Sequence, residues 1–230
     1  MGAVAVPPRP RGGRNRSGRN GFRGFEFVTL KRSLRWQLFP FLVALPAFLI
    51  ALSGETVGAV MQYERPAVSD GEVWRLLTGH WVHLGWRHLA LNLAGLFLVW
   101  HLFGRMLPLA GWLAVLLVIA LSQSAALMVF HPEILWYVGL SGLLHGLLAA
   151  GALAALRHMP LVGAGALLLL LAKLALETLQ PGVGIAGAGD WLGGPVVVES
   201  HRYGALAGLL IGAPAVWCTA RQAARRAGEA

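Results

Sequence analysis

Long apolar segments with few charges constrain this chain more than any other feature of its sequence. Of its 230 residues, 57% are hydrophobic and 13% are charged, whereas a soluble domain carries about 25% charged residues. A helix needs about 20 apolar residues to cross about 30 Å of hydrocarbon, and several segments approach that length. The composition therefore predicts an all-α polytopic membrane protein and excludes most soluble enzyme folds.

Six apolar segments are predicted to be membrane-spanning helices. They cover residues 36–52, 86–103, 109–130, 135–156, 161–176 and 201–218. The predicted organisation is a disordered basic cytoplasmic arm over residues 1–36, a six-helix membrane domain over 37–218 and a basic cytoplasmic tail over 219–230.

Positive charge is concentrated at the N-terminus and sets the predicted orientation. Residues 1–36 hold nine Lys and Arg side chains against one acidic residue, Glu26. With that arm inside, the acidic residues fall mostly in outside loops: Glu55, Glu64, Asp70, Glu72, Glu133, Glu177, Asp190 and Glu199. Cytoplasmic loops favour Lys and Arg, so both termini are predicted to be cytoplasmic. Lys173, within the fifth segment, is expected to extend its amine toward one interface.

Polar residues inside the predicted helices gather at one depth. Such groups are costly in a membrane, so each is a functional hypothesis. His88 and Asn92 begin the second segment, Ser141 lies about two turns into the fourth, and His201 begins the sixth. A histidine within hydrogen-bond reach can activate a serine as a nucleophile. No buried Asp or Glu is expected near Ser141 or His201, so the pattern predicts a Ser–His dyad.

Glycines offer a way to bring these helices together. Gly139 and Gly142 flank Ser141. The stripes are Gly142 and Gly146 in the fourth segment and Gly204, Gly208 and Gly212 in the sixth. Small residues allow two helices to approach closely. If the stripes meet, His201 lies beside Ser141. The alternative is that Ser141 and its glycine neighbours only pack helices.

Three further side chains are candidates for support. His88 and Asn92 are four residues apart and share a helix face, where their N–H groups can stabilise an oxyanion. The alternative is that they form interhelical hydrogen bonds. His145 follows Ser141 by one helical turn and is expected to orient or pack against His201.

The sequence resembles the rhomboid family of intramembrane serine proteases in three stretches. These are WRLLTGHWVHLGWRHLALN over residues 74–92, GLSG over 139–142 and HRYGALAG over 201–208. The longer stretch GLSGLLHG, which contains His145, is most similar to the rhombosortase branch. The rhomboid fold is a six-helix membrane bundle.

The resemblance implies roles for particular residues. It makes Ser141 the nucleophile and His201 the general base. It assigns His88 and Asn92, with the backbone N–H of Ser141, to the oxyanion, and it makes Arg75 structural.

The resemblance also implies substrates and location. A rhombosortase cleaves secreted proteins that end in a Gly-Gly motif, a transmembrane helix and a short basic tail. The expected location is a bacterial inner membrane, with the active site toward the periplasm. Membrane-protein substrates and the lipid bilayer are the expected partners, whereas no cofactor, metal or nucleic acid is expected.

Four other interpretations are open. The chain can be a general rhomboid protease of single-span membrane proteins or a non-catalytic rhomboid-like binder. Its eight histidines allow a metal or haem protein, although no HExxH motif is present. A transporter would place polar groups near the bilayer midplane, whereas here they gather near one face.

Overall fold

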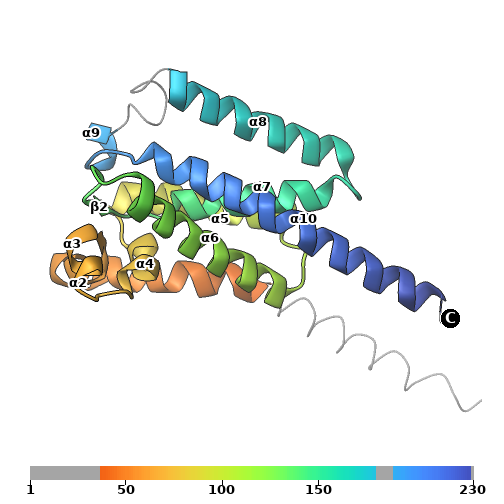
Figure 1. Cartoon of the computed structure of the whole chain (residues 1–230), viewed down its shortest axis with the longest axis horizontal. Helices are drawn as coiled ribbons and strands as arrows, with labels where there is room; N and C mark the ends of the chain where they lie inside the picture. Colours follow the sequence, from red (N-terminus) through yellow and green to blue (C-terminus); the bar gives the residue numbers. More distant parts are fainter. Residues whose placement is uncertain (1–36, 180–188, 229–230) are drawn as a thin grey trace, which may run out of the picture. The chain divides into compact units, whose positions relative to one another are not determined.

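The computed structural model describes residues 37–179 and 189–228. The predicted arm, residues 1–36, lies outside them. In chain order the elements are the helix Gln37–Leu52, α2 (Glu55–Met61), β1 (Tyr63–Glu64), α3 (Arg65–Ser69), α4 (Arg75–Thr78), the 3-10 turn η1 (Gly79–Trp81), α5 (Trp86–Phe103), α6 (Leu109–Phe130), β2 (Trp136–Tyr137), α7 (Ser141–Ala155), α8 (Pro160–Leu179), α9 (Gly189–Leu192) and α10 (Val198–Gly228) (Figure 1).

Each of the six predicted apolar segments contains a helix. The boundaries predicted for α5 and α6 agree with the structure. Among the described residues, α6 and α8 are long and apolar enough to cross a membrane, and the helix Gln37–Leu52 and α7 are shorter apolar helices. The number of crossings stays a prediction.

The fourth segment differs from its prediction at its start. It was expected to be helical from residue 135, but α7 begins at Ser141. Trp136 and Tyr137 instead form β2, which pairs antiparallel with β1. Gly139 then turns the chain with a φ of 120°, a conformation that side-chain-bearing residues rarely adopt. Ser141 is therefore the first residue of its helix and not two turns within it.

The last two long helices also run beyond their predicted limits. α8 ends at Leu179, so Glu177 lies in a helix and not in a loop. α10 begins at Val198 and continues ten residues past Cys218, to Gly228. For α8 the predicted end was set by the charge of Glu177, but a charge does not end a helix when its side chain has a partner, as Glu177 has in Lys173.

α7 is enclosed by other helices. It contacts α5, α6, α8 and α10, and most of its residues are buried. The glycine stripes allow its closest approach to α10, since a Cβ on Gly204 would overlap the carbonyl oxygen of Gly142 and one on Gly208 that of Gly146. The two helices therefore pack backbone against backbone, as small-residue stripes permit.

The outer faces of the helices are apolar. Side chains more than half exposed include Phe41 and Leu45 in the first described helix and Leu168, Leu169 and Leu171 in α8. Large contiguous apolar surfaces are rare on soluble monomers. Lipid solvates such surfaces, and helices satisfy their own backbone hydrogen bonds within it. The fold is that of an integral membrane protein.

Candidate active site

Ser141 and His201 form a hydrogen bond between two neighbouring helices. Oγ of Ser141, at the start of α7, lies 2.9 Å from Nε2 of His201, in the first turn of α10. His201 is only 3% exposed. The close packing of α7 on α10 thus brings together the two side chains predicted to be nucleophile and base.

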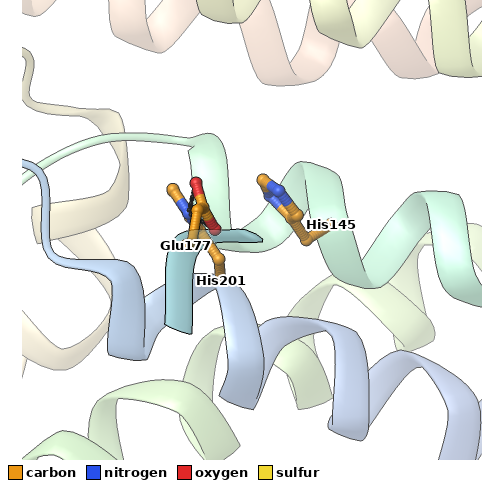
Figure 2. Close-up of side chains that lie close together, drawn as sticks. All are labelled: His145, Glu177 and His201. Atoms are coloured by element: carbon orange, nitrogen blue, oxygen red, sulfur yellow. Dashed lines mark hydrogen bonds and ion pairs between the residues drawn. The ribbon is translucent and has the colours of Figure 1, made fainter. Parts of the chain in front are cut away.

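A buried carboxylate lies on the other side of His201. Both carboxylate oxygens of Glu177 are 3.1 Å from Nδ1 of His201, and Glu177 is 5% exposed (Figure 2). The expectation that no buried acid lies near Ser141 or His201 is wrong. The arrangement of side chains is therefore not a simple Ser–His pair. Its physical reason is the extra length of α8, which carries Glu177 to the first turn of α10.

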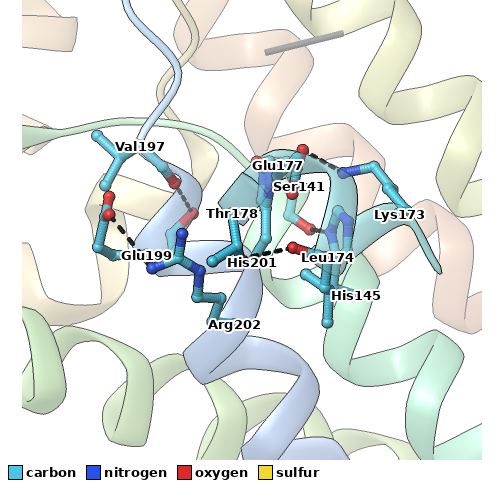
Figure 3. A network of polar contacts seen from close by, with 11 residues as sticks. Ser141, His145, Lys173, Leu174, Glu177, Thr178, Val197, Glu199, His201 and Arg202 are labelled. Atoms are coloured by element: carbon cyan, nitrogen blue, oxygen red, sulfur yellow. Dashed lines mark hydrogen bonds and ion pairs between the residues drawn. The ribbon is translucent and has the colours of Figure 1, made fainter. Parts of the chain in front are cut away.

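These contacts determine the tautomer of His201. An ionised carboxylate only accepts hydrogen bonds, so Nδ1 of His201 carries the proton. Nε2 then keeps its lone pair and accepts the hydrogen of Oγ of Ser141. Lys173 donates a hydrogen bond to Oε1 of Glu177 (Figure 3). The amine of Lys173 is therefore held by a residue one turn nearer the end of α8, and its extension toward an interface stays a prediction.

His145 packs against His201 ring to ring. The two ring centroids are 4.2 Å apart and their planes differ by 13°. Nδ1 of His145 donates to the carbonyl oxygen of Ser141 at 2.6 Å, one helical turn away. This bond fixes the orientation of the His145 ring, and the ring in turn forms one wall around His201.

Three of these side chains also carry atoms that can bind a metal. Donor atoms of His145, Glu177 and His201 lie within 4.8 Å of one another (Figure 2). A metal binds in the plane of an imidazole ring, along the nitrogen lone pair, and needs converging ligands. The stacked rings hold their lone pairs in two separate, nearly parallel planes, and Lys173 already supplies a cation to Glu177. The donor set fits a hydrogen-bonded chain better than a metal site.

His88 and Asn92 lie on the α5 side of the site, 7% and 5% exposed. Nδ1 of His88 accepts a hydrogen bond from the backbone N–H of Leu84 at 3.4 Å, so its proton is on Nε2. The ring lies against Gly139, where a Cβ would be 2.7 Å from Cε1 of His88. Nδ2 of Asn92 has no hydrogen-bond partner among the described residues. Within the described part of the chain, both side chains thus offer an N–H group to a ligand in the cavity beside Ser141.

The position of Ser141 at the start of α7 supplies a third donor. The first N–H groups of a helix have no partner within it, and the helix dipole places partial positive charge there. The backbone N–H of Ser141 is one of these groups. Negative charge that develops next to Oγ of Ser141 is therefore stabilised.

A cavity of about 530 Å³ adjoins the site. Ser141, His201, His88 and Asn92 line it together with His145 and Lys173. The rest of its wall is mainly apolar and comes from α5, α7, α8 and α9, including Leu91, Leu98, Leu144, Leu169 and Leu192. The serine therefore faces a space suited to an apolar ligand.

Arg75 lies apart from this cluster. It is buried in α4 and donates to the carbonyl oxygens of Ala59 at 2.7 Å and Gln62 at 2.8 Å, and to Glu72. These contacts tie together the segment that precedes α5.

Gln123 is a site neighbour that the sequence analysis missed. It is fully buried in α6, and a Cβ on Gly142 would overlap its side-chain amide. The sequence does contain an indication of its role, because Gln123 is a neutral polar residue among the 22 largely apolar residues of α6.

The fold and site together define a helical membrane protein with a partly buried serine and a buried histidine, paired as in serine hydrolases. Residues 70–218, more than half of the chain, match the Rhomboid domain family. The chain therefore belongs to the rhomboid family, which is a family of intramembrane serine proteases.

Two relatives from Bacillus subtilis (strain 168) are similar to it. "Rhomboid protease GluP" is 35% identical over 118 residues, which make up 49% of this chain and 23% of GluP. "Putative rhomboid protease YdcA" is 25% identical over 185 residues, which make up 80% of this chain and 84% of YdcA. The chain thus spans under a quarter of GluP but most of YdcA.

Proposed function

We propose that this chain is an intramembrane serine endopeptidase in which Ser141 is the nucleophile and His201 is the general base. The observation that carries the proposal is the 2.9 Å contact between Oγ of Ser141 and Nε2 of His201. This contact lies beside a largely apolar cavity in a chain of the rhomboid family.

The reaction begins when Oγ of Ser141 attacks the carbonyl carbon of a substrate peptide bond. An Oγ–C bond forms, the carbonyl electron pair moves to oxygen, and the serine proton passes to Nε2 of His201. His201 then gives that proton to the amide nitrogen as the C–N bond breaks. Water then attacks the carbonyl carbon of the acyl-enzyme and gives a proton to Nε2 of His201. His201 returns that proton to Oγ of Ser141 as the Oγ–C bond breaks and the acid product leaves.

Three donors stabilise the oxyanion of the tetrahedral intermediate in this scheme. They are Nε2–H of His88, Nδ2–H of Asn92 and the backbone N–H of Ser141. Two observations support this assignment. The side chains of His88 and Asn92 line the same cavity as Ser141, and Nδ2 of Asn92 has no hydrogen-bond partner among the described residues. Preorganised donors of this kind are worth several kcal/mol in acyl transfer.

The substrate is a membrane protein whose apolar segment occupies the cavity between α5 and α8. The leucines that line the cavity support this assignment, because they match an apolar chain better than a polar one. We propose the rhombosortase class of substrate, with a C-terminal Gly-Gly motif, a transmembrane helix and a basic tail. Its support is the GLSGLLHG stretch with His145. General cleavage of single-span proteins is the alternative, and a preference for Gly-Gly-tailed fusions would separate the two.

The proposed location is a bacterial inner membrane crossed six times by residues 37–218. The basic arm over residues 1–36 and the tail over 219–230 are cytoplasmic, and Ser141 faces the periplasmic side. The support is the excess of Lys and Arg in the arm and the acidic residues between the other segments.

Labelling with a fluorescent fluorophosphonate tests the proposed nucleophile and base. The detergent-purified wild type is expected to be labelled, whereas Ser141→Ala and His201→Ala are not, because the first lacks the nucleophile and the second its base. Ser53→Ala is the matched control, since Ser53 is exposed and bonds only to its own helix. Melting temperatures of Ser141→Ala and wild type should agree within a few degrees.

Absence of labelling in a folded wild type would contradict the proposal and favour a non-catalytic rhomboid-like binder. A large loss of stability in Ser141→Ala would instead identify Ser141 as a packing residue.

A further inference from the structure

We infer that Glu177 is a positioning residue for the reaction proposed above and that the site works as a Ser141–His201–Glu177 chain. This inference rests on the proposed function. It adds a carboxylate, supplied by a third helix, that holds and electrostatically supports the general base.

The geometry around His201 supports this role. Both oxygens of Glu177 lie 3.1 Å from Nδ1, while Nε2 lies 2.9 Å from Oγ of Ser141. The two ring nitrogens are thus occupied by an acceptor on one side and a hydroxyl donor on the other. A carboxylate at Nδ1 keeps the imidazole in the tautomer whose Nε2 can take a proton, as in serine protease triads.

The burial of the Glu177 carboxylate supports the same role, because such burial is costly. Glu177 is 5% exposed in a helix long and apolar enough to cross a membrane. An unpaired charge in such surroundings costs several kcal/mol, and even a paired one is weak evidence for stability. A packing role would be served as well by an apolar residue, so the buried acid is better explained by its contact with the base.

Lys173 explains how the carboxylate remains ionised before the reaction. Its Nζ donates to Oε1 of Glu177 from one helical turn away. The pair is neutral overall, and both partners come from α8. When His201 takes the serine proton, the new imidazolium charge forms next to Glu177. The carboxylate stabilises that charge and does not itself accept the proton.

The ring of His145 completes the positioning. It stacks on His201 at 4.2 Å and leaves that ring little freedom to tilt. The base is thus restrained at Nδ1, at Nε2 and over one face. The stacking contact constrains where the ring lies, whereas only Glu177 determines which nitrogen carries the proton.

The test compares Glu177→Gln with wild type by the kinetics of fluorophosphonate inactivation, which separate the maximal rate kinact from the binding constant KI. Glutamine keeps the size of the side chain but removes its charge and can donate to Nδ1. We expect kinact to fall on the order of 10²-fold or more, with KI within about twofold. Glu177→Asp, which retains a carboxylate, should keep more of kinact than Glu177→Gln.

The matched control is Glu133→Gln. The side chain of Glu133 is 67% exposed, and its carboxylate bonds to His131 and not to His201. This variant should inactivate at the wild-type rate. A kinact of Glu177→Gln within threefold of wild type would overturn the inference while leaving the proposed function intact. If wild type is not labelled at all, the proposed function itself fails.

A spectroscopic measurement on wild type does not depend on a variant that folds. Nitrogen-15 chemical shifts of labelled histidine, with the His201 signal assigned by its loss in His201→Gln, report which ring nitrogen is protonated. We expect the proton on Nδ1 of neutral His201. A proton on Nε2 would overturn the inference even if the labelling experiment supports a catalytic Ser141.

Discussion

Asn92 shows at the level of a single residue how the resting site is incomplete. Its side chain is buried in α5, and Nδ2 has no hydrogen-bond partner among the residues described. A buried donor without an acceptor costs about 1–3 kcal/mol. Such a donor is explained by an acceptor that arrives with the substrate, such as the oxyanion beside Ser141.

Asn92→Ala is therefore expected to lower kinact for fluorophosphonate on the order of 10²-fold to 10³-fold, the usual effect of removing one oxyanion donor. Its melting temperature should stay the same or rise, because no hydrogen bond within the described residues is lost. Time courses of fluorophosphonate inactivation give kinact, and thermal melts in detergent give the melting temperature. Wild-type kinact with a lowered melting temperature would instead make Asn92 a structural residue.

At the level of helices, the site depends on how closely α7 and α10 approach. Ser141 and His201 belong to different helices, and no loop connects them directly. The separation of those helices is set by glycines that face carbonyl oxygens across the contact. One added methyl group there must push the helices apart, and overpacking of this kind costs about 1–3 kcal/mol.

The pair Gly208→Ala and Gly165→Ala tests this dependence. A Cβ on Gly208 would overlap the carbonyl oxygen of Gly146, whereas one on Gly165, in α8, meets nothing within 4 Å. We expect Gly208→Ala to lower both the melting temperature and the labelling rate of Ser141. Gly165→Ala should leave both unchanged, since it adds the same atom in open space. Equal behaviour of the two variants would show that the α7–α10 contact is not tight.

On the scale of the whole described chain, residues 53–85 form hydrogen bonds with α6 and with the segment that precedes α7. β1 pairs with β2, and the backbone N–H of Gly139 donates to the carbonyl oxygen of Gly79 at 3.2 Å. His80 is fully buried, and its Nε2–H is shared between the carbonyl oxygen of Ala120 at 3.1 Å and Oγ of Ser124 at 3.0 Å, both in α6. Burial lowers the pKa of His80 from 6.5 to about 4.

This buried histidine makes stability depend on pH. Below pH 6.5 an unfolded His80 takes up a proton, while the folded one stays neutral down to about pH 4. The unfolded state then binds more protons, so stability falls as the pH falls through this window, on the order of 3 kcal/mol in total. Burial also lowers the pKa of His83, to about 3, which acts in the same direction.

His80→Gln is expected to flatten this dependence between pH 4.5 and 6.5, because glutamine does not titrate in that range. It should also be less stable than wild type at pH 7, since the geometry of the bonds to α6 changes. Melting temperatures of both proteins across the range provide the comparison. An unchanged slope in the variant would place the pH dependence elsewhere.

Much of the arrangement follows from local sequence. The ends of α5 and α6 agree with the apolar segments that predicted them, and glycines at helical spacing correctly indicated the meeting of α7 and α10. These features are readable because burial and small-residue spacing repeat along a helix. The start of α7 cannot be read from local sequence, because it depends on the pairing of β1 with β2, whose residues are more than 70 positions apart.

Glu177 shows the limit most clearly. The neighbouring sequence predicts that Glu177 lies in a loop, because it follows an apolar segment and an unpaired charge in a membrane is costly. Folding changes that balance by supplying Lys173 within the same helix and His201 from another. Helices, glycine stripes and the serine–histidine pair are thus encoded in short stretches of chain. The partner of a buried charge depends on which helices pack together, and only the tertiary structure decides it.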